Sequence, residues 1–88
     1  MSYKLIFDKK AIEFLESLPR EIRQRIFERI SAAKENPMHF FERLEGRRDY
    51  KLRAGDYRVI ADINHQLRRI EVTLIDHRKR VYKRLLRE

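Results

Sequence analysis

The sequence has no cysteine and no tryptophan, and its 88 residues include only two glycines and two prolines. Without cysteine, the chain can form neither a disulfide framework nor a thiolate metal site. Its histidines, His39, His65 and His77, show no metal-ligand spacing, so we expect no metal and no other cofactor. No stretch approaches the ~20 apolar residues of a membrane span, and the first residues contain no continuous apolar segment of the kind found in signal peptides. We therefore expect a cytoplasmic protein without a membrane partner.

Basic residues dominate the charge balance. The 22 lysines and arginines outnumber the 14 aspartates and glutamates, which gives a formal charge of +8. Residues 1–44 carry 9 basic and 7 acidic side chains, whereas residues 45–88 carry 13 and 7. A field of this sign favours a polyanionic partner, and nucleic acid fits better than a membrane surface because no strongly apolar stripe accompanies it. Solubility, or adaptation to high temperature through surface ion pairs, is the alternative explanation.

The stretch 50–60 reads as a β-hairpin with Gly55 and Asp56 as its turn. A two-residue loop of this kind fixes the register, because glycine readily takes the positive φ that such turns need. Ala54 then faces Tyr57, and the next opposed pairs are Arg53 with Arg58, Leu52 with Val59 and Lys51 with Ile60.

This register divides the hairpin into two faces. Leu52 and Val59 belong to an apolar face, while Lys51, Arg53 and Arg58 belong to the other. We expect that second face to be open to solvent, with the Arg58 side chain outside the core. Two opposed arginines should destabilise the hairpin by roughly 0.2–1 kcal/mol compared with a neutral pair, and an anion bound between them would remove this cost. The alternative is that the cationic side chains simply splay apart in solvent.

The remaining elements follow from hydrophobic periodicity. Residues 3–7 alternate as a strand with Tyr3, Leu5 and Phe7 on one side. Two helices follow, separated at Pro19, and residues 38–49 form the longest irregular connection. Residues 69–75 read as a strand whose core face holds Ile70, Val72 and Leu74. The two helical stripes comprise Ala11, Phe14, Leu15 and Leu18, then Ile22, Ile26, Phe27, Ile30 and Ala33.

The chain ends in a second basic cluster. Residues 78–87 contain six cations and no acid, and Val81, Tyr82, Leu85 and Leu86 recur at helical spacing. We expect a short amphipathic helix, in which Tyr82 is either a half-buried anchor or a functional side chain. The predicted fold is a single α+β domain over residues 1–88. An antiparallel sheet, made of the N-terminal strand and a three-stranded meander, packs on a two-helix hairpin, with a short C-terminal helix.

These features resemble the RelE/ParE superfamily of toxin-antitoxin toxins, and within it the RelE-like messenger-RNA interferases. The likeness covers nearly the whole chain and rests on the element order and on three stretches, residues 44–46, 50–60 and 77–82. It implies a toxin that enters the ribosomal A site and cuts messenger RNA there. It also implies a RelB-like antitoxin as partner, with operator DNA bound only through the toxin-antitoxin complex.

The resemblance also implies roles for individual residues. Arg58 and Arg78 match the phosphate-binding arginines of the family, Lys51 an active-site lysine and Tyr82 the C-terminal tyrosine. The further candidates for binding RNA are Arg53, His77, Lys79, Arg80 and Lys83. Two positions depart from the pattern, because Asp49 and His77 stand where some relatives have lysine. The proton acceptor is therefore either Tyr82 or His77.

Such an enzyme needs neither metal nor water, because the 2′-hydroxyl of RNA can attack the adjacent phosphorus. The products are a 2′,3′-cyclic phosphate and a free 5′-hydroxyl. Residues must accept a proton, stabilise the phosphorane and assist the leaving oxygen. Two other functions stay open at this point. A ParE-like toxin would poison a DNA topoisomerase by binding it, and a non-catalytic member would act as a co-repressor bound to its antitoxin.

Overall fold

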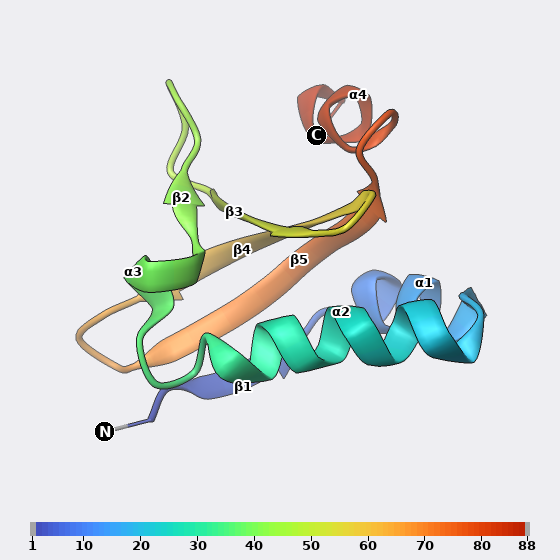
Figure 1. Cartoon of the computed structure of the whole chain (residues 1–88). Helices are drawn as coiled ribbons and strands as arrows, with labels where there is room; N and C mark the ends of the chain where they lie inside the picture. Colours follow the sequence, from blue (N-terminus) through green and yellow to red (C-terminus); the bar gives the residue numbers. More distant parts are fainter. Residues whose placement is uncertain (1, 88) are drawn as a thin grey trace.

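The computed structural model describes residues 2–87 and confirms the predicted α+β fold class (Figure 1). A five-stranded sheet has the strand order β1-β5-β4-β3-β2. The elements are β1 (Lys4–Phe7), α1 (Lys9–Ser17), α2 (Arg20–Ala32), α3 (Pro37–Phe40), β2 (Glu42–Arg43), β3 (Tyr50–Ala54), β4 (Tyr57–Asn64), β5 (Arg69–His77) and α4 (Val81–Leu86). No helix within residues 2–87 is long and apolar enough to cross a bilayer.

The β3–β4 hairpin has the predicted register. Arg53 pairs with Arg58, Leu52 with Val59, and Lys51 with Ile60. Gly55 occupies the turn with φ 61°, a conformation that residues with a Cβ rarely adopt. The local turn chemistry was therefore sufficient to fix this part of the sheet.

The N-terminal strand differs from the expected antiparallel arrangement. β1 pairs with β5 in parallel, and Leu5 lies opposite Ile70. Parallel neighbours need a long crossover connection, and the chain between these two strands includes the α1–α2 pair. As predicted, Tyr3, Leu5 and Phe7 pack against the core.

Helices α1 and α2 cover one face of the sheet (Figure 1). Leu15 of α1 and Ile26 and Ile30 of α2 are buried there with Leu52 and Val59 of the hairpin. Phe27 departs from the expected stripe, because 48% of it is exposed. Its ring stacks on Phe7 with the centroids 6.4 Å apart, so it packs at the margin of this core.

The connection expected to be irregular contains two elements. Pro37 begins the short helix α3, as its missing N–H permits, and Glu42–Arg43 forms strand β2 at the edge of the sheet. Phe41 between them is buried, with 2% of its surface exposed, and pins this segment to the core.

A β-bulge in β5 changes which residues face the helices. Ala61 pairs with Val72, but the adjacent Ile60 pairs with Leu74, so Thr73 is an extra residue on β5. An extra residue reverses the alternation of all side chains beyond it. The prediction that Leu74 shares a face with Ile70 and Val72 was therefore wrong, and Leu74 lies on the opposite face.

We had expected the face opposite α1 and α2 to be open to solvent. Instead, α4 packs on part of it (Figure 1). Ile60 and Leu74 of the sheet form a second small core with Val81 and Leu85 of α4. Leu44, from the segment between β2 and β3, packs against the same cluster. Strands β4 and β5 are thus buried on both faces where α4 covers them.

Substitutions of one buried and one exposed leucine test which residues form the core. Leu52 is fully buried, so Leu52→Ala should lower the free energy of unfolding by about 2–5 kcal/mol through the cavity that it leaves. Leu67 lies in the turn between β4 and β5 with 62% of its surface exposed. Leu67→Ala should therefore change the free energy of unfolding by less than about 0.5 kcal/mol. Urea denaturation measures both values. Equal effects of the two substitutions would contradict the proposed core.

Candidate nucleic-acid interface

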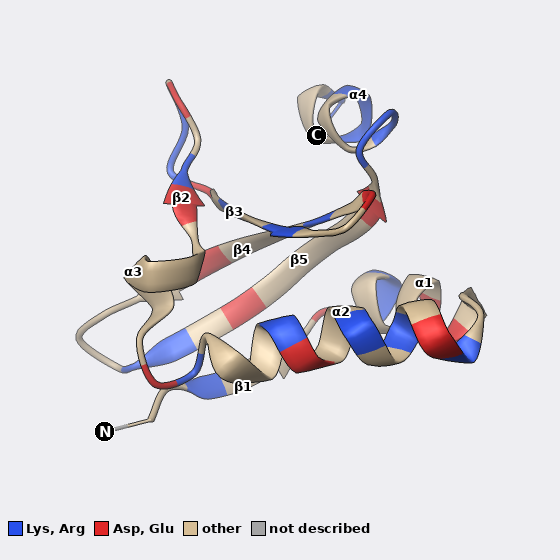
Figure 2. Cartoon of the chain, viewed as in Figure 1, with Lys and Arg blue, Asp and Glu red and all other residues tan. Residues whose placement is uncertain are grey.

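Cationic side chains collect on the sheet face that carries α4. Lys51 and Arg53 of β3 and Arg58 of β4 belong to this face by register. The segment that leads into α4 is almost continuously basic, whereas α2 on the other side mixes both signs (Figure 2). Exposed cations in and before α4 are Arg78, Lys79, Arg80, Lys83 and Arg84. The fold therefore brings the two basic clusters of the sequence to the same side of the sheet.

Arg58 lies on the predicted face but is buried, with 7% of its surface exposed, which corrects our expectation of a solvent-exposed side chain. Its NH1 group donates hydrogen bonds to the carbonyl oxygens of Gly55 and Tyr57, both at 2.9 Å. None of the ion pairs found within residues 2–87 includes Arg58. Neutral carbonyl groups thus fix the guanidinium in place and leave its positive charge without a paired carboxylate.

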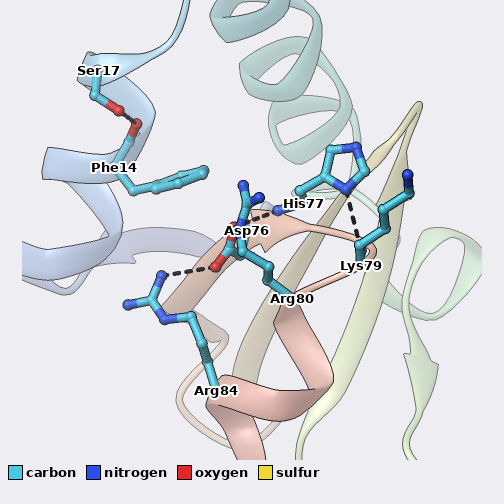
Figure 3. A network of polar contacts seen from close by, with 7 residues as sticks. All are labelled: Phe14, Ser17, Asp76, His77, Lys79, Arg80 and Arg84. Carbon is cyan, nitrogen blue, oxygen red and sulfur yellow. Dashed lines mark hydrogen bonds and ion pairs between the residues drawn. The ribbon is translucent and has the colours of Figure 1, made fainter.

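Asp76 is the buried acid of this face and lies directly opposite Arg58 on the neighbouring strand. Only 1% of it is exposed. Its carboxylate accepts hydrogen bonds from the His77 backbone amide at 2.6 Å, from Arg80 Nε at 3.2 Å and from Arg84 NH1 at 2.9 Å (Figure 3).

These contacts determine the charge state of Asp76. Burial raises the pKa of the carboxyl group, but the hydrogen bonds from Arg84 and the His77 amide and the charge of Arg80 outweigh burial. The net effect holds the pKa of Asp76 below its ordinary value of 3.8. Asp76 is thus an anion at neutral pH, and two arginines, Arg80 and Arg84, bind its carboxylate.

Arg78 is attached to the hairpin turn. Its backbone amide donates to the Asp56 carbonyl at 2.8 Å, and its Nε lies 3.8 Å from the Asp56 carboxylate. The side chains of Arg78 and Asp56 are 54% and 69% exposed. An ion pair this exposed is weak, so the Arg78 guanidinium can turn to an anionic ligand at little cost.

Tyr82 lies on α4, between the Val81 and Leu85 positions that anchor this helix to the sheet. The tyrosine itself is 38% exposed, so more than a third of its surface is open to a ligand. Lys51 is half-buried on the same sheet face, opposite Ile60. Tyr82 and Lys51 are therefore both available at the surface on this side of the molecule.

His77 is directed differently from the other candidates. It pairs with Tyr57 on the face that α1 covers, and the two rings meet edge to face with centroids 5.4 Å apart. The His77 Nδ1 accepts a hydrogen bond from the Lys79 backbone amide at 3.2 Å, so the neutral ring carries its proton on Nε2. The structure does not bring His77 together with Arg58. The unprotonated ring nitrogen of His77, Nδ1, already accepts the hydrogen bond from Lys79.

Two residues of this site, Asp76 and Arg84, were not identified from the sequence. The available signal was the spacing, since Asp76 is the lone acid among residues 72–87 and cations follow it at i+4 and i+8. That spacing suggests ion pairs within a helix, but Asp76 belongs to a strand, so only the packing of α4 on β5 creates the network. Among residues 2–87, no group of three His, Asp or Glu side chains could hold a metal ion.

The comparisons with known proteins agree with this architecture. A sequence profile described as the ParE toxin of the type II toxin-antitoxin system parDE matches residues 5–82. No curated protein matches this chain. The archaeal RelE-RelB complex of Pyrococcus horikoshii contains a chain that is 30% identical, with a TM-score of 0.77, covering 91% of this chain and 99% of that one.

Two further structures share the fold at lower sequence identity. A chain of the RelBE2 toxin-antitoxin complex of Mycobacterium tuberculosis has a TM-score of 0.79 at 22% identity, covering 88% of this chain and 99% of that one. A double mutant of the E. coli toxin RelE in the free state has a TM-score of 0.75 at 24% identity, covering 94% and 93%.

The ionised Asp76 should stabilise the folded protein in a pH-dependent way. Because its pKa is lowered on folding, this stabilisation is present above about pH 4 and is lost as the pH falls through 3.8 towards the folded-state pKa. Asp76→Asn should therefore lower the Tm at pH 7, with a smaller deficit at about pH 3. Melting curves followed by circular dichroism measure this difference. A deficit of the same size at both pH values would show that the charge of Asp76 is not responsible.

Proposed function

We propose that this chain, which belongs to the ParE toxin family of type II toxin-antitoxin systems within the RelE/ParE superfamily, is a ribosome-dependent endoribonuclease. Its substrate is messenger RNA in the ribosomal A site of the cytoplasm, and cleavage inhibits translation. The observation that carries this proposal is the state of Arg58, a buried guanidinium oriented by two carbonyl groups and not paired with an acid.

A guanidinium of this kind suits phosphoryl chemistry. When the 2′-oxygen bonds to phosphorus, negative charge builds up on the non-bridging oxygens before the bond to the 5′-oxygen breaks. A cation that is already oriented stabilises this charge without reorganising, and arginine offers a planar set of donors that lysine lacks. Arg58 takes this role, and Arg78, held loosely at the hairpin turn, closes on the same phosphate.

The remaining roles fall to Tyr82 and Lys51. The exposed Tyr82 on α4 orients the 2′-hydroxyl and, in its phenolate form, receives its proton, while the Lys51 ammonium donates a proton to the leaving 5′-oxygen. We favour Tyr82 over His77 because His77 faces α1 and its Nδ1 already accepts a backbone hydrogen bond. A site without a strong base depends on the ribosome to bend and present the RNA for in-line attack.

Relatives of similar fold have been solved as RelE-RelB complexes, and we infer an acidic RelB-like antitoxin for this chain as well. Opposite charge would draw such an antitoxin to the cationic face around α4 and block the site. Operator DNA would then be bound only through the toxin-antitoxin complex.

The matching profile is described by the name ParE, and this supports a second candidate function. A ParE-like toxin poisons a DNA topoisomerase by binding to it and needs neither Tyr82 nor a phosphorane site. Inhibition of DNA supercoiling by the purified protein, without cleavage of ribosome-bound messenger, would select that alternative.

The mechanism predicts which substitutions slow the reaction. Arg58→Lys, Arg78→Ala and Tyr82→Phe should each slow single-turnover cleavage of ribosome-bound messenger by ~100-fold or more, with much smaller losses in ribosome binding. Lysine is chosen at position 58 because it retains the charge of this buried side chain while removing the planar donors. Circular dichroism verifies that each variant is folded.

Two controls accompany this experiment. His77→Ala should reduce the rate far less than Tyr82→Phe, and an equal loss would reassign the proton acceptor. A messenger with 2′-deoxyribose at the cleavage position has no nucleophile and should stay intact. Efficient cutting of that substrate, or products with a 5′-phosphate, would refute the in-line mechanism.

The charge of the face also predicts the kinetics of antitoxin binding. Raising the ionic strength from about 0.05 to 0.5 M should slow association at least ~10-fold, because screening removes the electrostatic attraction. Stopped-flow mixing with the acidic antitoxin measures the rate. Lys83→Gln on α4 should reduce the salt dependence more than Lys10→Gln on α1, which is the matched control on the other side of the sheet. Association rates independent of salt would exclude electrostatic steering.

A further inference from the structure

Asp76 and the two arginines that it binds have no role in the reaction described above. A carboxylate that is 1% exposed loses most of its hydration, so its three hydrogen bonds must replace water. By contrast, the side chains of Arg80 and Arg84 are 61% and 42% exposed. The acid is thus hidden from solvent, whereas the arginine side chains that bind it are partly exposed.

We propose that Asp76 is a positioning residue that holds the guanidinium of Arg84 on the sheet face that carries Arg58, and that Arg84 binds a phosphate of the RNA. The proposal rests on the proposed function in one respect, namely that RNA is the ligand of this face. Arg80 binds the same carboxylate, because its Nε donates a hydrogen bond to Oδ1 of Asp76, whereas Arg84 binds Oδ2.

The number of donors leaves room for such a ligand. A guanidinium carries five N–H donors, and the hydrogen bond to Asp76 Oδ2 uses one donor of Arg84. The remaining donors lie on a partly exposed side chain and can bind phosphate oxygens in a forked geometry. Since the carboxylate fixes the side chain before the ligand arrives, less conformational entropy is lost on binding.

The balance of charge points in the same direction. Arg80 and Arg84 both bind the single carboxylate of Asp76, and Arg58 lies opposite Asp76 in the register of β4 and β5. One negative charge cannot neutralise the two arginines that bind it, and Arg58 on the same face has no paired carboxylate, so positive charge is in excess where α4 meets the sheet. A phosphate dianion or two successive phosphate groups of a nucleic acid would compensate it.

Holding α4 in place is not a sufficient explanation for Asp76. The helix is already fixed to the sheet by Val81 and Leu85, which pack on Ile60 and Leu74. A buried ion pair is moreover a poor source of stability compared with apolar packing of similar volume. Orientation of cationic donors is a task that apolar residues could not perform.

The test is the binding of a short single-stranded RNA oligonucleotide, followed by fluorescence anisotropy over a range of salt concentrations. Arg84→Gln should weaken binding at least ~5-fold at low salt and reduce the slope of log K against log salt by about 0.7, the value for one lost phosphate contact. Arg87→Gln is the matched control, because it removes the same charge just beyond the same helix, where Asp76 does not hold the side chain. Equal losses for the two variants would overturn the proposal.

Asp76→Asn distinguishes positioning from net charge. This substitution raises the net charge of the protein by one, so electrostatics alone predicts tighter RNA binding. Our proposal predicts binding at least ~3-fold weaker, because Arg84 is released, and no further loss when Asp76→Asn is added to Arg84→Gln. Tighter binding by Asp76→Asn would refute the proposal. If this variant does not fold, the comparison of Arg84→Gln with Arg87→Gln still decides the question, because both side chains are exposed.

The RNA-binding assay is independent of cleavage. A wild-type protein that binds RNA with this pattern of mutant effects but does not cut ribosome-bound messenger would refute the nuclease and leave the Arg84 site intact. If the wild-type protein cuts messenger but Arg84→Gln binds RNA as tightly as the wild type, the Arg84 site is refuted and the nuclease is kept.

Discussion

The bulge at Thr73 is the constraint on which the rest of the structure depends. It shifts the β4–β5 register by one residue, so that Arg58 lies opposite Asp76 and Ile60 lies opposite Leu74. Without the extra residue, Asp76 would pair with Tyr57 and turn towards α1. Asp76 would then be absent from the face that carries α4, and the contact of α4 with the sheet and the second small core would be lost with it.

Because of this register, the sheet has two faces with different tasks. Helices α1 and α2 bury the larger core on one face, where Leu52, Val59 and Val72 lie without exposure to solvent. On the other face, α4 covers only part of the sheet, and arginines occupy the margin of that contact. An apolar contact thus positions cations that would otherwise repel one another at close range.

Under the proposed function, the same arrangement would give the toxin fold two arginines for RNA. Arg58 is oriented by carbonyl groups and Arg84 by a carboxylate, so one cation is uncompensated and the other is partly neutralised. The first suits the charge that develops in a transition state, and the second suits a ground-state phosphate contact. Cleavage and binding would then be carried by neighbouring arginines held in different ways.

The sequence by itself determined the hairpin register, the α+β class, the burial of Leu52 and Val59 and the gathering of cations towards the C-terminus. These features depend on a two-residue turn, on short-range periodicity and on composition, which act within a few residues. Only the tertiary structure decided the parallel pairing of β1, the burial of Arg58, the direction of His77 and the network of Asp76 with Arg84. Each of these depends on a single extra residue in β5 or on contacts between segments far apart in the chain, and alternation along a strand cannot report an inserted residue or a helix that folds back from the terminus.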